Sequence, residues 1–373
     1  MSILLTENCI GCGACQHACI PGSIELKQEH DGFIRAYISE IGCTGCGRCK
    51  IVCPQLRAKR YRPEVFFAYQ NPNSTELDKS QSGGAFLPLA RAVIERGGVV
   101  YGVQWGRKCS HVEFSRASTL EQVKLFSGSK YIPAPLNSIL KKIKEDVKNE
   151  RIVLFCGLPC QVAAIRNLFP HSDNLFLIEL LCMGPMSPHV WNILRHNMPS
   201  DLIHFWFRDK SRRGWGMRDA RYEFSDGTSK SFCSEKFPAW KIFESGAAMS
   251  SSCLNCKFRS LDRVADITLG DFWGIENFLP LPHAVRKRGI SLVHAQTPTG
   301  ERYLSALQAG ILGKFKDFDK IVSTNGGYFL NSASIISRQK SFFNFSRVFG
   351  FRLSVWFISL LSKIGYNFPK WFS

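Results

Sequence analysis

Eight cysteines near the N-terminus have the spacing that iron–sulfur clusters require. The stretches "CIGCGACQHAC" and "CTGCGRCKIVC" each follow the pattern C-x2-C-x2-C-x3-C. This is the pattern of a bacterial-type ferredoxin with two [4Fe-4S] clusters, in which the last cysteine of each run binds the other cluster. Eight cysteines in two matching runs fit neither disulfides nor zinc knuckles, because zinc sites take their ligands in pairs rather than quartets. The predicted ligand sets are Cys9, Cys12, Cys15 and Cys53 for one cluster, and Cys19, Cys43, Cys46 and Cys49 for the other.

Four further cysteines are candidates for a third metal centre. Cys160 opens a predicted helix, Cys182 ends a predicted strand, and Cys253 and Cys256 form a C-x2-C pair. A helix N-terminus lowers the pKa of a thiol and so favours the thiolate that binds iron. Spacing alone leaves three interpretations open: a [4Fe-4S] cluster, a structural zinc ion, or inert core cysteines. The remaining cysteines are predicted to be structural, with a Cys156–Cys160 redox pair as an alternative: Cys109, Cys156 and Cys233.

Two glycine-containing turns and a glycine-rich strand end are candidates for cofactor binding. The chain has neither G-x-G-x-x-G nor G-x-x-x-x-G-K-[ST], so the common dinucleotide and triphosphate sites are not predicted. Free N–H groups at a helix start can bind phosphate, and glycine lets the backbone approach a ring closely. In the turn 128–131, Lys130 is expected to add a phosphate-directed charge, with a hydroxyl from Ser129 and a stacking ring from Tyr131. Ordinary helix and turn capping remain alternatives. The candidate residues are Ser82, Gly83, Gly84, Gly128, Ser129, Lys130, Tyr131, Asp266, Gly270, Asp271 and Trp273.

These residues must be positioned by a fold in which short apolar strands alternate with helices. Apolar runs bounded by Gly, Asn or charged residues predict buried strands, and amphipathic stretches between them predict helices. Such alternation predicts an α/β core, followed by a more mixed region with antiparallel strands. Strands are predicted over 64–70, 98–105, 151–157 and 174–182, antiparallel strands over 204–209, 221–227, 266–274 and 291–296, and helices over 83–98, 134–150 and 159–169.

The 373 residues can hold two or three domains. We expect an α+β dicluster ferredoxin domain over 1–60 and an α/β core with a mixed sheet over 64–335, divided into 64–150 and 151–335. A basic, aromatic-rich helical tail is expected over 336–373. Its stretch 349–361 is too short and too charged to span a membrane, so contact with the membrane surface and docking on the protein are the alternatives.

The net charge of +18 favours acidic partners. Basic clusters occur at 57–63, 208–221 and 286–288, without a helix-turn-helix, zinc-finger or RNP signature, so nucleic-acid binding is not predicted. Each cluster is expected to form a solvated face or to dock an acidic redox protein. An acidic electron-carrier protein such as ferredoxin is the expected partner. Iron–sulfur thiolates need a reducing compartment, and the first residues lack the features of a secretory signal, so we expect a cytoplasmic protein. Peripheral contact with the inner face of the membrane is an additional candidate.

Five motifs resemble, in order, those of the family of coenzyme F420 (deazaflavin) hydrogenase/dehydrogenase beta subunits, here preceded by a dicluster ferredoxin domain. They are "QSGGAF", "FSGSKYIPAPL", "LFCGLPCQVAAIRNL", "CMGPMSPHVW" and "SCLNCKFRSLDRVADITLGDFWGIE". The resemblance implies FAD and a [4Fe-4S] cluster within the α/β core, the latter at Cys160, Cys182, Cys253 and Cys256. Where family members often have Cys-His-Gly, this chain has Cys182-Met183-Gly184, which puts a shared acid–base role there in doubt.

The combined expectation is an iron–sulfur flavoprotein oxidoreductase. Electrons would pass from a ferredoxin-like donor through the clusters to FAD and a small organic acceptor, and relatives of this kind often accompany polysaccharide assembly. The sequence does not identify the acceptor or a catalytic acid or base. One alternative is an electron-transfer subunit that serves a separate catalytic partner. Another is a membrane-associated scaffold stabilised by its clusters, which ferredoxin-type runs argue against.

Overall fold

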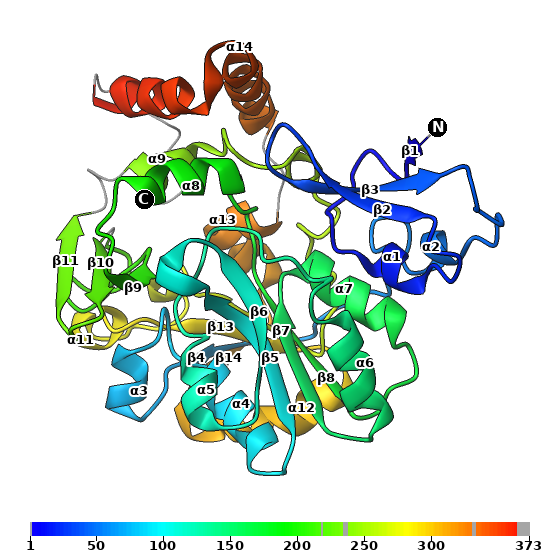
Figure 1. The fold of residues 1–373 in the computed structure, drawn as a ribbon. Helices are drawn as coiled ribbons and strands as arrows, with labels where there is room; N and C mark the ends of the chain where they lie inside the picture. The colour runs from blue at the N-terminus through cyan, green and yellow to red at the C-terminus, as the bar shows by residue number, and fades with distance from the viewer. Residues whose placement is uncertain (1, 218, 234–237, 330–332, 364–373) are drawn as a thin grey trace.

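The N-terminal region has the small sheet and two short helices of a ferredoxin-like unit (Figure 1). The computed structural model describes residues 2–217, 219–233, 238–329 and 333–363. Strands β1 (Ser2–Leu4), β2 (Ile24–Gln28) and β3 (Ile34–Ser39) pair antiparallel in the order β1-β3-β2, beside helices α1 (Ala14–Ala18) and α2 (Arg48–Ile51). Gly13 and Gly47 precede the two helices with φ of 75° and 72°. Only glycine takes this conformation without strain, which lets each cysteine loop turn tightly into its helix.

An eight-stranded mixed sheet forms the centre of the rest of the chain. Its order is β14-β4-β13-β12-β8-β7-β5-β6, in which the central neighbours β12, β8, β7 and β5 are parallel and the outer pairs are antiparallel. The parallel strands therefore end at one common edge. The strands are β4 (Phe66–Tyr69), β5 (Val99–Trp105), β6 (Val112–Ala117), β7 (Val153–Gly157), β8 (Leu175–Leu180), β12 (Ile267–Asp271), β13 (Ser291–Ala295) and β14 (Ile311–Phe315).

Helices cover both faces of this sheet, because its central strands are apolar on both sides. Alternate residues of β7 enter different cores: Val153 and Phe155 pack with helices α6 (Leu140–Lys148) and α7 (Pro159–Leu168), whereas Leu154 packs with α4 (Phe86–Ile94). The period-2 alternation of side chains along a strand produces this division. Further helices of the core are α3 (Ser74–Asp78), α5 (Leu120–Lys124), α10 (Ser251–Leu254), α11 (His283–Arg286), α12 (Pro298–Leu304) and α13 (Phe318–Phe329), with 3-10 turns at Arg107–Cys109, Ile275–Asn277 and Ser305–Gly310.

A second, smaller sheet lies at the other end of the molecule from the ferredoxin-like region (Figure 1). It is antiparallel in the order β11-β10-β9 and is built from β9 (Leu202–Trp206), β10 (Asp219–Phe224) and β11 (Ser229–Cys233). Helices α8 (Pro188–His196) and α9 (Pro238–Ser245) accompany it, and the long helix α14 (Ala333–Lys363) contacts both. Gly350 interrupts α14 with non-helical angles.

The predicted α/β core with a mixed sheet and the N-terminal ferredoxin-like region are confirmed. Two predicted helices are shorter than expected: α4 covers Phe86–Ile94 rather than 83–98, and the helix predicted from residue 134, α6, begins only at Leu140. Pro133 and Pro135 explain much of the late start of α6, because each favours an extended residue before it. Part of the predicted tail, residues 364–373, lies outside the described residues, and the tail as a separate unit stays a prediction. No helix in the described ranges combines the length and apolar character needed to cross a bilayer.

Candidate redox centre and cofactor cavity

The first predicted ligand set comes together at the inner side of the ferredoxin-like region. Cys9, Cys12, Cys15 and Cys53 all line one small cavity, and the backbone N–H of Ala36 donates to Cys9 Sγ at 3.3 Å. Burial raises the pKa of the Cys15 thiol to about 12, and the nearby Cys9 and Cys53 thiolates raise it further. Four clustered thiolates that repel one another fit a cationic iron cluster, which would compensate their charge.

The second set lies on the outer side of the same region. Cys43 and Cys46 are exposed on the loop between β3 and α2, while Cys49 on α2 and Cys19 after α1 pack against the buried cysteines of the first set. The backbone N–H of Arg48 lowers the pKa of the Cys46 thiol. This half of the cysteine pattern therefore faces solvent, whereas the first half faces the rest of the protein.

The four candidate ligands of a third cluster also come together. Cys160 is the second residue of α7, Cys182 follows β8, Cys253 lies in α10, and Cys256 follows two residues after that helix ends. Burial raises the pKa of Cys160 well above its ordinary value, and the thiolates of the other three raise it further. The backbone N–H of Gly184 donates to Cys182 Sγ at 3.2 Å. The fold therefore brings together cysteines that lie up to 96 residues apart in the sequence, Cys160 and Cys256.

The described residues contain no group of three or more His, Cys, Asp or Glu side chains placed to hold a single metal ion. Four ligands of one zinc ion must each approach it to about 2.1–2.3 Å. The thiolates around a cubane bind four different irons instead, so a zinc ion and a [4Fe-4S] cluster require different separations between the four sulfurs.

The first and third cysteine sets are neighbours across the boundary between the two regions. The Cys12 thiolate is one of the charges that raise the pKa of Cys160, and helix α1 contacts helix α7. Polar contacts at this boundary include those from Asn167 Nδ2 to the Arg57 carbonyl at 2.8 Å and from Lys257 Nζ to the Gln55 carbonyl at 2.9 Å. The cysteine sets thus form a series that runs from the outer loop into the core.

A cavity of about 790 Å³ lies at the carboxyl ends of the parallel strands. Cys156 and Gly157 at the end of β7, Leu180 at the end of β8 and Asp271 at the end of β12 all line it. Open α/β sheets bind their ligands at this edge, because the loops that leave the strands diverge there. The volume lies in the range of small-molecule and cofactor sites.

Most of the predicted cofactor residues line this cavity. They come from three separate stretches of the chain that the sheet brings to one edge. The cavity-lining members are Ser82, Gly84, Gly128, Ser129, Lys130, Tyr131, Gly270, Asp271 and Trp273.

Gly83 and Asp266 are not among the lining residues. A Cβ on Gly83 would stand 2.2 Å from the Tyr69 carbonyl oxygen, so this glycine permits close packing between backbone segments. The Asp266 carboxylate is buried, pairs with Arg166 at 2.9 Å and accepts from the Leu177 N–H at 2.8 Å. These contacts give Asp266 a structural role at the start of β12, at the other end of the strand from the cavity, and its predicted place beside a ring is corrected.

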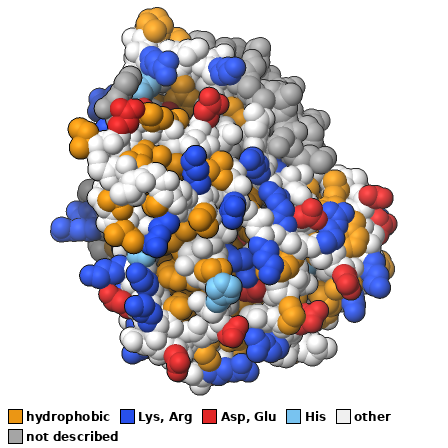
Figure 2. Space-filling model, turned by 90° about the vertical axis from the view of Figure 1, so that its right-hand side faces the viewer, with side chains coloured by type: hydrophobic (Ala, Val, Ile, Leu, Met, Phe, Trp, Pro, Cys, Tyr) orange, Lys and Arg blue, Asp and Glu red, His pale blue; other side chains and the backbone are white. Residues whose placement is uncertain are grey.

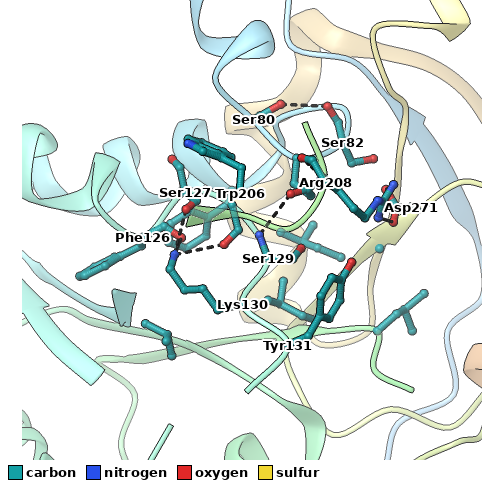
Figure 3. A pocket seen from close by; sticks show the side chains of 18 of the residues that line it. Ser80, Ser82, Phe126, Ser127, Ser129, Lys130, Tyr131, Trp206, Arg208 and Asp271 are labelled. Atoms are coloured by element: carbon teal, nitrogen blue, oxygen red, sulfur yellow. Dashed lines mark hydrogen bonds and ion pairs between the residues drawn. The ribbon is translucent and has the colours of Figure 1, made fainter. Parts of the chain in front are cut away.

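Lys130 lines the cavity, but its ammonium does not point at an open phosphate position. Lys130 Nζ donates to the carbonyls of Phe126, Ser127 and Gly128 at 3.1, 2.8 and 3.1 Å (Figure 3). Burial lowers its pKa to about 7. The side chain therefore closes the turn after α5 on itself. The expectation that Lys130 directs its charge at a phosphate is therefore wrong. Its ammonium instead holds the turn that forms part of the cavity wall.

Sequence reasoning missed the strongest polar contact in the cavity. Arg208 Nη1 pairs with Asp271 Oδ2 at 2.6 Å, with both side chains 9% exposed, and Trp215 Nε1 donates to Asp271 Oδ1 at 2.9 Å. Burial works to lower the pKa of Arg208, but the Asp271 charge offsets this and raises it. The signal was present in the basic stretch 208–221, which the sequence assigned to a solvated or docking face. The ion pair with Asp271 instead allows Arg208, the first residue of this stretch, to be buried.

Aromatic side chains form much of the remaining wall. Tyr131 stacks on Phe243 with ring centroids 4.1 Å apart, and Trp273 stacks on Trp215 at 4.5 Å. Tyr328 accepts from Trp273 Nε1 at 3.1 Å, and burial raises the pKa of its hydroxyl. Flat apolar rings beside a few fixed charges suit a planar heteroaromatic ligand with a polar or anionic extension.

The cavity also reaches the third cysteine set. Cys182, Met183 and Gly184 belong to its lining, so the end of β8 serves both features. Met183, which stands where the resembling family often has histidine, provides a thioether and no titratable group. In the described residues that line the cavity there is no histidine.

Two family models match this chain. Residues 8–56 match the 4Fe-4S dicluster domain, and residues 150–320 match the family described as the C terminus of the coenzyme F420 hydrogenase/dehydrogenase beta subunit. The resemblance found in the sequence motifs is therefore confirmed, and the N-terminal match supports two [4Fe-4S] clusters.

Two curated relatives are similar over part of their length. The F subunit of the F(420)H(2) dehydrogenase of Methanosarcina mazei is 26% identical over 200 residues, 48% of this chain and 55% of the relative. The coenzyme F420-dependent sulfite reductase of Methanocaldococcus jannaschii is 24% identical over 168 residues, 44% of this chain and 26% of the relative. The chain thus spans about half of the first and a quarter of the second.

One solved structure covers 77% of this chain and 94% of its own, at 17% identity and a TM-score of 0.48. It is titled as a xenon derivative of the F420-reducing [NiFe] hydrogenase complex from Methanosarcina barkeri.

Proposed function

We propose that this chain, in which a dicluster ferredoxin domain precedes a domain of the family of coenzyme F420 hydrogenase/dehydrogenase beta subunits, is an iron–sulfur flavoprotein oxidoreductase. The observation that carries the proposal is the shared boundary of the third cysteine set and the cavity, at Cys182. A redox role follows from the dicluster domain, and both curated relatives are named as oxidoreductases or their subunits. When bound, iron–sulfur clusters supply one-electron transfer and a flavin exchanges one or two electrons.

We assign a third [4Fe-4S] cluster to Cys160, Cys182, Cys253 and Cys256. Their mutual proximity, their burial and the position of Cys12 beside Cys160 support this assignment. The protein would hold three cysteine quartets in series, and the residues of this chain would set their spacing and exclude water from the inner two.

We assign FAD to the cavity. The start of α4 lines it at Gly84, Ala85 and Phe86, and Ala85 provides no side-chain cap, so the first N–H groups of this helix are available to an anion. Lys79 and Lys124 line the same cavity and add positive charge. The aromatic wall near Tyr131 would hold the ring, and the Arg208–Asp271 pair would orient its polar edge.

Iron content and colour test the proposal together. We expect anaerobically purified protein to hold about twelve irons per chain, since three cubanes carry four each. Cys256→Ser should lower this by about four, whereas Cys233→Ser, which lies outside all three sets, should not. A wild-type iron content near eight would remove the third cluster from the proposal.

The cavity ligand is tested by extraction and mass spectrometry. FAD released on denaturation supports the flavin assignment. A deazaflavin, the coenzyme named in both curated relatives, would keep the oxidoreductase function and replace FAD. A colourless protein that binds neither would favour the alternative, an electron-transfer subunit serving a separate catalytic partner.

We further propose an acidic electron-carrier protein as donor and an organic acceptor, with the domain limits 1–60, 64–335 and 336–373. The charge of +18 supports the acidic carrier.

Helix α14 supports peripheral membrane contact: Val348, Phe349, Leu353 and Trp356 are exposed on it, and no Asp or Glu occurs from Lys320 to Ser373. Sedimentation with anionic vesicles that is lost in Phe349→Ser/Trp356→Ser would support this contact, and equal sedimentation would remove it.

A further inference from the structure

The two most exposed large hydrophobic side chains in the described ranges lie beside the outer cysteine set. Ile41 is 84% exposed and precedes Cys43 by two residues, and Ile20 is 77% exposed and follows Cys19. Ile51, at the end of α2, is also exposed. Single exposed aliphatic residues are common on proteins, but three around one cysteine set call for an explanation.

These residues belong to one surface rather than to scattered loops. The Ser39 N–H donates to the Ser23 carbonyl at 2.8 Å, and a Cβ on Gly42 would lie 3.4 Å from Ser23 Oγ. The turn after α1 therefore lies against the loop after β3, and α1 contacts α2. We call this surface the outer face and define it by Ile20, Ile41, Arg48, Lys50 and Ile51.

The charge of this surface is positive. Two of its five defining residues, Arg48 and Lys50, are cations, and the chain has no Asp or Glu from Ile41 to Ile51. Arg62 pairs with Asp262 at 3.0 Å, but within the described part of the chain Arg48 and Lys50 are exposed and make no ion pair. Figure 2 shows Lys and Arg side chains spread among hydrophobic ones on the side of the molecule that carries the ferredoxin-like region.

We propose that the outer face is the docking surface for an acidic electron-carrier protein of the ferredoxin class. This inference rests on the proposed function and specifies its entry point. Apolar contact at the three isoleucines would bring the carrier close to the outer cysteine set, and Arg48 and Lys50 would steer and orient its acidic surface. One electron would leave the reduced carrier, which would be oxidised, and would reduce the cluster that Cys19, Cys43, Cys46 and Cys49 would hold. No bond or proton changes in this step.

The location has a physical reason. Electron transfer between proteins requires short distances, and Cys43 and Cys46 are the exposed members of the predicted sets. Two residues of the basic stretches 208–221 and 286–288 are engaged in other contacts: Arg208 is buried against Asp271, and Arg288 pairs with Asp78 at 2.9 Å. The outer face combines the exposed cations Arg48 and Lys50 with exposed isoleucines, and it lies beside the exposed cysteines of the outer set.

The test measures binding of an oxidised, acidic bacterial ferredoxin with two [4Fe-4S] clusters to the full chain by calorimetry. We expect a Kd that weakens about tenfold or more between about 20 mM and 300 mM NaCl, because charge steers the complex. Arg48→Glu/Lys50→Glu should weaken the Kd about tenfold or more at low salt, and Ile20→Asp/Ile41→Asp should do the same. The matched control Lys230→Glu/Lys316→Glu makes the same charge change on exposed residues elsewhere and should leave the Kd unchanged.

Iron content and reduction by dithionite, which needs no docking, verify that each variant keeps its clusters. Wild-type binding that is insensitive to salt, or equal loss of affinity in the control variant, would overturn the proposal even if a variant loses iron. Binding of phosphatidylserine vesicles in place of ferredoxin, abolished by the same substitutions, would also overturn it and assign the face to a membrane. These results leave the iron and flavin measurements untouched, so failure of this inference is separable from failure of the proposed function.

Discussion

The buried ammonium of Lys130 holds the turn that closes one wall of the cavity. Its three carbonyl acceptors lie at successive residues, Phe126 to Gly128, in the turn that follows α5. A charged donor that satisfies buried oxygens stabilises a fold more than a surface ion pair does, because water cannot replace it.

Lys130→Met should therefore lower the free energy of unfolding by about 1–3 kcal/mol, since it removes the donor from three part-buried carbonyls. Urea denaturation of the full protein measures this. Lys124→Met is the matched control: Lys124 is half-exposed and pairs with the exposed Glu121, so its loss should cost under about 1 kcal/mol. Equal effects of the two substitutions would contradict the structural role of Lys130.

His204 gives the stability of the protein a dependence on acid. Burial, with the nearby Lys130 and Arg221 charges, lowers its pKa to about 3. Between pH 3 and 6.5 the unfolded chain binds more protons than the folded one at this residue, so stability rises with pH and is lost as pH falls.

We expect His204→Phe to flatten this dependence by on the order of 1–2 kcal/mol between pH 6.5 and pH 5. Unfolding midpoints at both pH values, with iron content measured in parallel, provide the readout. The same slope in wild type and variant, at constant iron content, would show that His204 is not the group responsible.

At the scale of elements, the loop after β8 joins the third cysteine set to the cavity. Gly184 has φ of 109°, donates to Cys182 Sγ and leaves space beside Cys253 that a side chain would fill: a Cβ would lie 3.1 Å from Cys253 Cβ. This loop can hold a cluster and bound a cavity only because it turns sharply at a residue without a side chain.

Gly184→Ala should reduce the iron content by up to four per chain while the ferredoxin-type clusters remain visible by paramagnetic resonance. Gly227→Ala is the control, since Gly227 also has a positive φ of 83° but nothing lies within 4 Å of the point where its Cβ would stand. Equal iron in wild type and Gly184→Ala would exclude a cluster packed against this loop.

At the scale of the whole molecule, the cysteine sets connect the outer loop with the sheet edge. The ferredoxin-like region has a small apolar cluster of its own, built largely around Cys9, Cys15 and Ile24. A core of this size stabilises little by itself, so metal binding must contribute much of the stability of this region.

Removal of iron by a chelator under reducing conditions should therefore loosen this region before the core. Limited trypsin digestion should cut the iron-free protein first at Arg48 and Lys50, while the sheet strands stay protected. Mass spectrometry of early fragments identifies the sites. Early cleavage within β7 or β8 at the same rate would show instead that the clusters stabilise the whole chain.

The sequence by itself determined the features that depend on residues close to one another along the chain. Cluster ligands lie two or three residues apart, so their spacing is readable along the chain, and period-2 and helical patterns identified β4, β5, β7, β8 and helix α7 with small shifts. Gly84 and Ser129 could be proposed for the same reason: turn and helix-start chemistry depends on neighbours in sequence.

Only the tertiary structure decided which distant residues meet. Arg208 and Asp271 are 63 residues apart, and their burial depends on the loop after β9 folding over the end of β12. Lys130 and Asp266 carry charges that look available in the sequence, yet nearby carbonyls and Arg166 engage them once the chain is packed. A buried charge must find a partner, and strand order determines which partner is within reach.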